Sequence, residues 1–237
     1  MNPIVMVRPR KAQAREETGG RDDLQGTVEL PENFLKWQAE SRRELFDRLL
    51  AAEEIPFLAS HLPVVATRSE GDRINLANKG VGLVPRAELV GFYLGLYRDT
   101  FASGEGRPWA DTLADRVDAA LHLVQHPEHI DATRLGSLEI FEGETFRNVR
   151  SDPRVSLLYT GEGPRYPSFQ MDVVAQIQKP GDPLYEFLVA SRMLFEYEHF
   201  HIAQPGYPYA YAFSVRGVRD KTPKRRCPVS KGAARKA

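Results

Sequence analysis

The spacing of hydrophobic residues along this chain changes several times between that of a helix and that of a strand. Residues 31–54 carry apolar side chains at roughly helical intervals and predict an amphipathic helix. A second helical stripe covers about 109–124, with acids near its start and Pro127 at its end. A third helix is expected after Asp182, which serves as its N-cap, with Pro183 at the first helical position.

Strand patterns fill most of the remaining middle of the chain. A short β-branched segment precedes the turn 69–72, and 73–84 is expected to form one second strand. A third strand with an aromatic-rich centre is expected at 87–97. Later strands are expected at about 136–142, 154–160, 168–178 and 209–220. Six or seven mostly antiparallel strands with three helices predict an α+β fold with a barrel-like sheet.

The two ends of the chain differ from the middle in composition. The start is polar and lacks sustained periodicity, and the end carries seven Lys or Arg residues from Lys221 onward without one acid. We expect a flexible arm at 1–26, a single domain at 27–220 and a basic flexible tail at 221–237, because no repeat or linker divides the middle.

Composition and charge exclude several function classes. Lys+Arg and Asp+Glu both number 32, so no overall field attracts nucleic acid. The single cysteine, Cys227, rules out an intrachain disulfide. No apolar run approaches the ~20 residues of a membrane helix, and the start lacks the apolar centre of a secretory signal. We therefore expect a cytoplasmic protein that acts on small molecules rather than on membranes or nucleic acid.

A polar segment between the fourth and fifth expected strands is the main candidate for binding chemistry. Thr145, Arg147, Asn148 and Arg150 offer the hydroxyl, amide and guanidinium groups that a phosphate requires. If the segment forms a helical turn, its first N–H groups add to an anion site, and the two arginines share a face. The alternative is that the arginines are simply solvated and that Asn148 or Asp152 caps the turn.

The expected strand 73–84 carries further candidates. Strand alternation places Asn75 and Lys79 on one face. A lysine within an apolar strand lies at a sheet edge or faces a ligand, and the sequence leaves both readings open. Gly80 and Gly82 fit the close approach of a flat ring, and equally fit a bulge.

These segments together resemble the FMN-binding split barrels, the pyridoxamine-phosphate-oxidase-like and flavin-reductase-like proteins. In that family a strand leads to a segment with Ser or Thr, a basic residue and Asn, and an N-x-x-x-D/N-P-x-V pattern then enters the next strand. Here the pattern reads Asn148-Val-Arg-Ser-Asp152-Pro153-Arg-Val155. The resemblance covers 60–220 loosely and 136–160 tightly, with the helix at about 109–124 as an insertion.

The resemblance implies an FMN-dependent oxidoreductase that works as a homodimer, with the hydride carried by the isoalloxazine. The cofactor-binding residues that it implies are Thr145, Arg147, Asn148 and Lys79 at the phosphate, and Asn75 and Gly80 along the ring. No side chain presents itself as a catalytic acid or base. Two other classes remain open: a non-catalytic heme- or flavin-binding protein on the same barrel, and an interaction protein with no cofactor.

The histidine clusters do not lead us to predict a metal site. The spacing of His122, His126 and His129 can hold zinc, but the Glu of an H-E-x-x-H pattern is missing, and a helix C-terminus favours imidazolium. His199 and His201 lie two apart beside two acids, where a helix is expected to end. In the heme alternative, His126, His199 or His201 would be the axial ligand.

Tyrosines near the end of the domain are a separate question. Tyr207 and Tyr209, together with His199 and His201, are candidates for substrate contact. Their rings could wall a flat ligand, although packing in the core or at a dimer interface is the favoured use.

Overall fold

The computed structural model describes residues 26–55, 60–69, 71, 73–162, 166–196 and 206–223 of the 237-residue chain. Within this part, five α-helices and one seven-stranded antiparallel sheet confirm the predicted α+β class. Nearly all of the predicted arm (1–25 of 1–26), most of the basic tail, and His199 and His201 lie outside the described residues. No helix of the described part has both the length and the apolar character needed to cross a bilayer.

The helices are α1 (Glu32–Leu50), α2 (Val90–Ser103), α3 (Trp109–Gln125), α4 (Glu144–Ser151) and α5 (Pro183–Met193). Two short 3-10 helices, η2 (Ala87–Leu89) and η3 (Pro127–His129), precede α2 and β4. The strands are β1 (Val64–Arg68), β2 (Ile74–Asn78), β3 (Val81–Pro85), β4 (Ile130–Glu139), β5 (Arg154–Thr160), β6 (Ser168–Gln178) and β7 (Tyr209–Asp220).

The order of the strands brings the two ends of the sheet close together. The order is β2-β1-β5-β6-β7-β4-β3, so β2 and β3 are the outer strands. Only Lys79 and Gly80 separate them along the chain. Three Cα–Cα steps span at most about 11 Å, so the sheet must curl until its ends approach each other. No ladder of hydrogen bonds joins β2 to β3 in this order, so the sheet is curled but not closed.

Two expectations about the early strands are wrong. The segment expected as one strand, 73–84, forms β2 and β3, which pair with β1 and β4 respectively. The segment expected as a third strand, 87–97, instead contains the first half of α2. Its aromatic residues favour a strand by propensity, but Val90, Tyr93 and Tyr97 are buried at i, i+3 and i+7, which is a helical repeat.

The later elements follow the sequence patterns more closely. The helix expected at about 109–124 is α3, but it forms a pair with α2, so the insertion between β3 and β4 is two helices rather than one. The strands expected at 154–160, 168–178 and 209–220 are β5, β6 and β7. The fourth expected strand is longer at its start than predicted, because β4 begins at Ile130.

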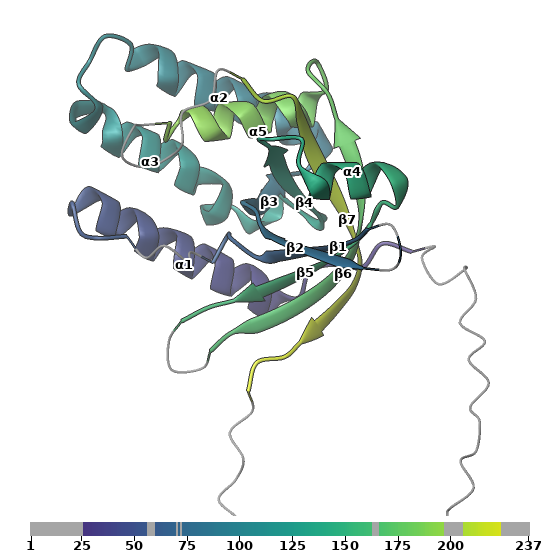
Figure 1. Ribbon diagram of the computed structural model, residues 1–237. Helices are drawn as coiled ribbons and strands as arrows, with labels where there is room; N and C mark the ends of the chain where they lie inside the picture. The colour runs from purple at the N-terminus through teal and green to yellow at the C-terminus, as the bar shows by residue number, and fades with distance from the viewer. Residues whose placement is uncertain are drawn as a thin grey trace, which may run out of the picture.

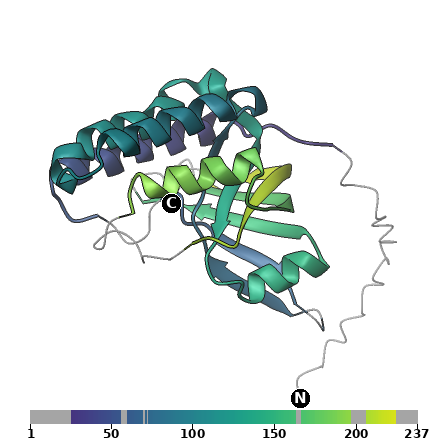
Figure 2. The same cartoon turned by 90° about the horizontal axis from the view of Figure 1, so that it is seen from above.

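The helices lie on two sides of the curled sheet (Figure 1). Helices α1, α2, α3 and α5 gather on one side, and α4 lies apart from them against β1 and β2. Figure 2, the view from above, shows the inserted helices as a layer beyond α5. Two apolar cores result: one inside the curled sheet, around Tyr159, Met171 and Tyr211, and one among the helices, around Tyr93 and Phe187.

Candidate functional site

A cavity of about 660 Å³ lies between the β3–β4 end of the sheet and the layer of helices. Small-molecule sites in proteins typically measure roughly 300–1,000 Å³. Helices α1, α2, α3 and α5 all contribute side chains to it. Its apolar walls include Phe46, Leu83, Tyr97, Leu123, Phe187 and Phe195. These walls suit a ligand with a large apolar or aromatic body.

The charged groups around the cavity are all basic. Arg42, Lys79 and Arg192 line it, together with His61. None of the described residues that line it is Asp or Glu. Lys79 is paired with Glu139, which does not line the cavity, and Arg192 contacts Tyr207. Arg42 is therefore the cation best able to attract an anion. A low-dielectric wall strengthens such an attraction. The cavity is therefore suited to an apolar ligand that carries negative charge.

Arg42 of α1 is the cation whose charge is least compensated. It is half-buried, and its guanidinium carbon lies 5.8 Å from the centre of the Phe46 ring. Within the described part of the chain, no carboxylate or hydrogen-bond acceptor contacts it. Burial lowers the pKa of Arg42 from its usual value, and only the neighbouring Tyr97 opposes this effect. A bound anion would supply the partner that the described part of the chain does not.

A second buried arginine is hydrogen-bonded within the protein. Arg116 of α3 donates from Nε to Thr112 Oγ1 at 2.9 Å and from Nη1 to the Leu194 carbonyl at 3.0 Å. Its guanidinium also lies 4.9 Å from the centre of the Trp109 ring. These contacts explain Arg116 as part of the helical core, because two of its five donors bind protein oxygens and its guanidinium packs on an aromatic ring. Arg42 makes no such hydrogen bonds to the residues that the structure describes.

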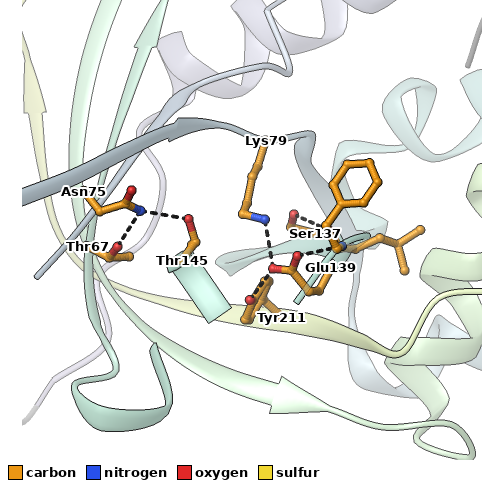
Figure 3. Close-up of polar contacts among 9 residues, drawn as sticks. Thr67, Asn75, Lys79, Ser137, Glu139, Thr145 and Tyr211 are labelled. Carbon is orange, nitrogen blue, oxygen red and sulfur yellow. Dashed lines mark hydrogen bonds and ion pairs between the residues drawn. The ribbon is translucent and has the colours of Figure 1, made fainter. Parts of the chain in front are cut away.

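Lys79 pairs with a buried carboxylate at the link between β2 and β3 (Figure 3). Its Nζ lies 2.8 Å from Glu139 Oε2, and the Glu139 side chain is only 1% exposed. The Tyr211 hydroxyl donates to the same oxygen at 2.5 Å, and the Phe141 N–H donates to Oε1 at 3.1 Å. Burial raises the pKa of Glu139, but these hydrogen bonds and the Lys79 charge outweigh it, so the pKa lies below its usual value.

The polar residues of α4 form a separate network with β1 and β2. Asn148 Nδ2 donates to Thr67 Oγ1 at 3.1 Å and to Ser69 Oγ at 3.2 Å. Asn75 Nδ2 donates to Thr67 Oγ1 at 3.2 Å and to Thr145 Oγ1 at 3.1 Å (Figure 3). An amide has two N–H donors, so both are used within the protein in each asparagine. The network therefore fastens α4 to the sheet.

The structure divides the predicted cofactor-binding residues between these places. Lys79 and Gly80 line the cavity. Asn75, Thr145 and Asn148 belong to the α4 network and do not line it, and Arg147 is exposed on the outer face of α4. An added Cβ at Gly80 would meet no atom within 4 Å, so the space beside it is open.

The two tyrosines proposed for substrate contact do not line the cavity. The Tyr207 hydroxyl donates to Glu196 Oε1 at 2.8 Å and accepts from Arg192 Nε at 3.2 Å. Tyr209 stacks on Phe146 of α4, with ring centres 4.7 Å apart. Tyr207 thereby contacts Arg192, which does line the cavity.

Sequence reasoning missed Arg42, Glu139 and Tyr211. Glu139 does leave a signal, because an acid inside the apolar run "GSLEIF" needs a buried partner. Arg42 leaves none: it is one of several basic residues on the polar side of an amphipathic helix. Only the packing of α1 against β3 and α3 distinguishes it from a solvated arginine.

Comparison with known proteins gives similarity in structure only. No protein-family model matches the sequence, and no curated protein matches it. Among solved structures, one match is a candidate pyridoxamine 5'-phosphate oxidase from Listeria innocua, at 10% identity and a TM-score of 0.40, covering 75% of this chain and 98% of that one. Another is HutZ, a heme storage protein from Vibrio cholerae, at 12% identity and a TM-score of 0.40, covering 81% and 94%.

A third match is an FMN-binding protein from Syntrophomonas wolfei, at 10% identity and a TM-score of 0.39, covering 80% of this chain and 95% of that one. All three likenesses lie at 10–12% identity and TM-scores of 0.39–0.40. A likeness this remote does not say which ligand this chain binds, which has to be argued from its own residues.

Proposed function

We propose that the protein is a split-barrel flavoprotein that binds FMN in the cavity and acts as an oxidoreductase. One observation carries the proposal: a cavity with apolar and aromatic walls is lined by Arg42, Lys79 and Arg192 and, among the described residues, by no acid. A flavin nucleotide joins a flat, largely apolar ring to a phosphate with about two negative charges, and so matches both properties.

Different residues of the chain would bind the phosphate and the ring of the cofactor. Arg42 would pair with the phosphate, because its guanidinium has no carboxylate partner in the described structure. The apolar walls would exclude water from the ring, and Gly80 leaves room beside the β2–β3 link. When bound, the flavin itself supplies the hydride chemistry, and the protein supplies orientation and charge.

The proposal places the phosphate in the cavity rather than at α4. The sequence alone favours α4, through Thr145, Arg147 and Asn148. The two asparagines beside that helix, however, use both of their amide N–H groups on protein oxygens. Arg42 is therefore better placed to hold an anion together with a ring, with Lys79, already paired with Glu139, lining the same cavity.

The homodimer implied by the resemblance is part of the proposal. The outer strand β2 exposes Ile74 and Leu76, at 61% and 64%, on one face. An outer strand with exposed apolar side chains is an aggregation hazard unless it is covered. A second copy of this chain would cover it, and sedimentation equilibrium of the purified protein tests this directly.

A second candidate function is heme binding, which one observation favours. His61 lines the cavity and could supply an axial ligand, and heme propionates would pair with Arg42 as a phosphate would. The absorption spectrum of the purified protein distinguishes the two cofactors, because flavin and heme have different visible bands. A Soret band lost in His61→Ala would replace the flavin proposal by this one.

A titration with FMN tests the proposal, using a matched pair of variants. Arg42→Gln removes the charge in the cavity, whereas Arg43→Gln removes the neighbouring charge on the exposed side of α1. Loss of a charged hydrogen-bond partner costs about 1.5–3 kcal/mol, so Arg42→Gln should weaken binding roughly 10- to 100-fold. Arg43→Gln should bind like the wild type. Reduction of bound FMN by NADH or NADPH would support the oxidoreductase, and no FMN binding by the wild type would refute it.

A further inference from the structure

A second cluster of chemically active side chains lies where α3 ends and β4 begins. His126, Glu128 and His129 each offer one ligand atom, and these atoms lie within 4.8 Å of one another. His126 Nδ1 is 3.2 Å from Glu128 Oε1, and His129 Nε2 is 3.8 Å from the same oxygen. None of the three residues lines the cavity, so the cluster is independent of the proposed flavin site.

These separations are close to those around a tetrahedral metal ion. Zinc binds imidazole nitrogen and carboxylate oxygen at about 2.0–2.2 Å, which places neighbouring ligand atoms about 3.3 Å apart. Two separations, 3.2 and 3.8 Å, are near this value, and the third is no more than 4.8 Å. Rotations of the exposed Glu128 and of the partly exposed histidines would bring the three atoms into range. The imidazoles of His126 and His129 are already stacked, with centres 4.9 Å apart and planes within 18°.

The buried Tyr93 of α2 fixes the orientation of one imidazole. Its hydroxyl lies 2.8 Å from His129 Nδ1 and 3.2 Å from His122 Nδ1. A hydroxyl has one proton to donate, so it can donate to His122 and accept from His129 Nδ1–H. In that arrangement His129 Nε2 keeps its lone pair and faces Glu128. Metal-binding histidines commonly donate their second N–H to such a partner, which fixes the ring.

The sequence alone does not predict a metal here, because the histidine spacing lacks an acidic ligand in the expected position. The structure provides one. The carboxylate comes from Glu128, within the turn η3, rather than from an H-E-x-x-H helix. Two imidazoles and one carboxylate leave a coordination position for water, and the Glu128 side chain is 63% exposed to it. We propose that His126, Glu128 and His129 bind one divalent first-row metal ion, zinc by ligand preference, with Tyr93 positioning His129.

Titration of the untagged full-length protein with Co²⁺, followed by Zn²⁺ competition, tests the proposal. The expected result is visible absorption typical of tetrahedral Co²⁺ at one ion per chain, displaced by Zn²⁺. His126→Ala and His129→Ala should each abolish this band. Tyr93→Phe, which removes the positioning hydroxyl, should weaken binding about 10- to 100-fold. A His199→Ala/His201→Ala double variant is the control and should bind like the wild type.

Two results would overturn the proposal: no uptake of either ion by the wild type, or uptake that only the His199/His201 double variant abolishes. Circular dichroism of each variant checks that the chain is folded. X-ray absorption of the Zn²⁺-loaded wild type needs no variant at all, and it should show two imidazole ligands. Fewer than two would count against the site.

Discussion

Lys79 and Glu139 are joined by a 2.8 Å ion pair between the β2–β3 link and the end of β4. The pair lies where the two ends of the curled sheet approach each other, and Tyr211 of β7 completes it. The contact therefore connects three segments that are distant in sequence. It also holds the β2–β3 link, and with it Gly80, at the wall of the cavity.

Lys79→Met should destabilise the protein strongly. The substitution leaves the Glu139 carboxylate buried without its cation, which typically costs about 3–5 kcal/mol. The double variant Lys79→Met/Glu139→Gln removes both charges and should recover part of that loss. Urea unfolding monitored by circular dichroism measures both free energies of unfolding. Equal losses in the single and double variants would show that the ion pair does not govern stability here.

The same carboxylate predicts how stability depends on pH. Because the pKa of Glu139 is lower in the folded protein than its usual value of about 4.3, its contribution to stability is fully present above that value. The contribution is lost as pH falls through the folded pKa. The unfolding free energy of Glu139→Gln should therefore fall less than that of the wild type on acidification. Parallel pH profiles of the two proteins would contradict this.

The α4 network should contribute to stability but not to FMN affinity. Asn148→Ala removes one of the two amides that donate to Thr67 and the amide that donates to Ser69, and should cost about 1–3 kcal/mol. Arg147→Gln, on the exposed face of the same helix, should change stability by less than about 0.5 kcal/mol. Neither substitution should alter FMN affinity once folding is confirmed. Weaker FMN binding by Arg147→Gln would indicate that the phosphate lies at α4 instead, as the sequence alone suggests.

The sequence predicted correctly those elements in which the spacing of apolar side chains within the segment itself decides between helix and strand. In β5, Val155, Leu157 and Tyr159 alternate with less buried residues, so the pattern alone predicts this strand. In α2, by contrast, aromatic residues suggested a strand, and the helical repeat of burial becomes clear only once α2 packs on α5 and α3. The break at Lys79 and Gly80 depends on pairing with two different strands, which a local pattern does not contain.

For the same reason, the sequence could predict only some of the residues of the candidate site. Lys79 and Gly80 were identified because a lysine and a glycine interrupt an apolar stretch. Arg42 became a candidate only because no carboxylate among the described residues pairs with it, and that observation requires the positions of α1, α3 and β3 together. Asn148 was predicted to bind the phosphate, with capping of the turn as the alternative. In the structure its amide donates to Thr67 and Ser69, which gives it a role in fastening α4 to the sheet.

Two glycine substitutions test how tightly α1 packs on the sheet. A Cβ added at Gly161, just after β5, would lie 2.6 Å from Trp37 Cζ2, and that ring is held by stacking on Phe169 at 5.7 Å. Gly161→Ala should therefore cost about 1–3 kcal/mol through overpacking and change tryptophan fluorescence. Gly80→Ala meets no atom within 4 Å and has no positive φ, so stability should be unchanged or slightly raised. If Gly161→Ala were as stable as Gly80→Ala, Trp37 would have room to move, and α1, which also carries Arg42, would not be held rigidly beside the cavity.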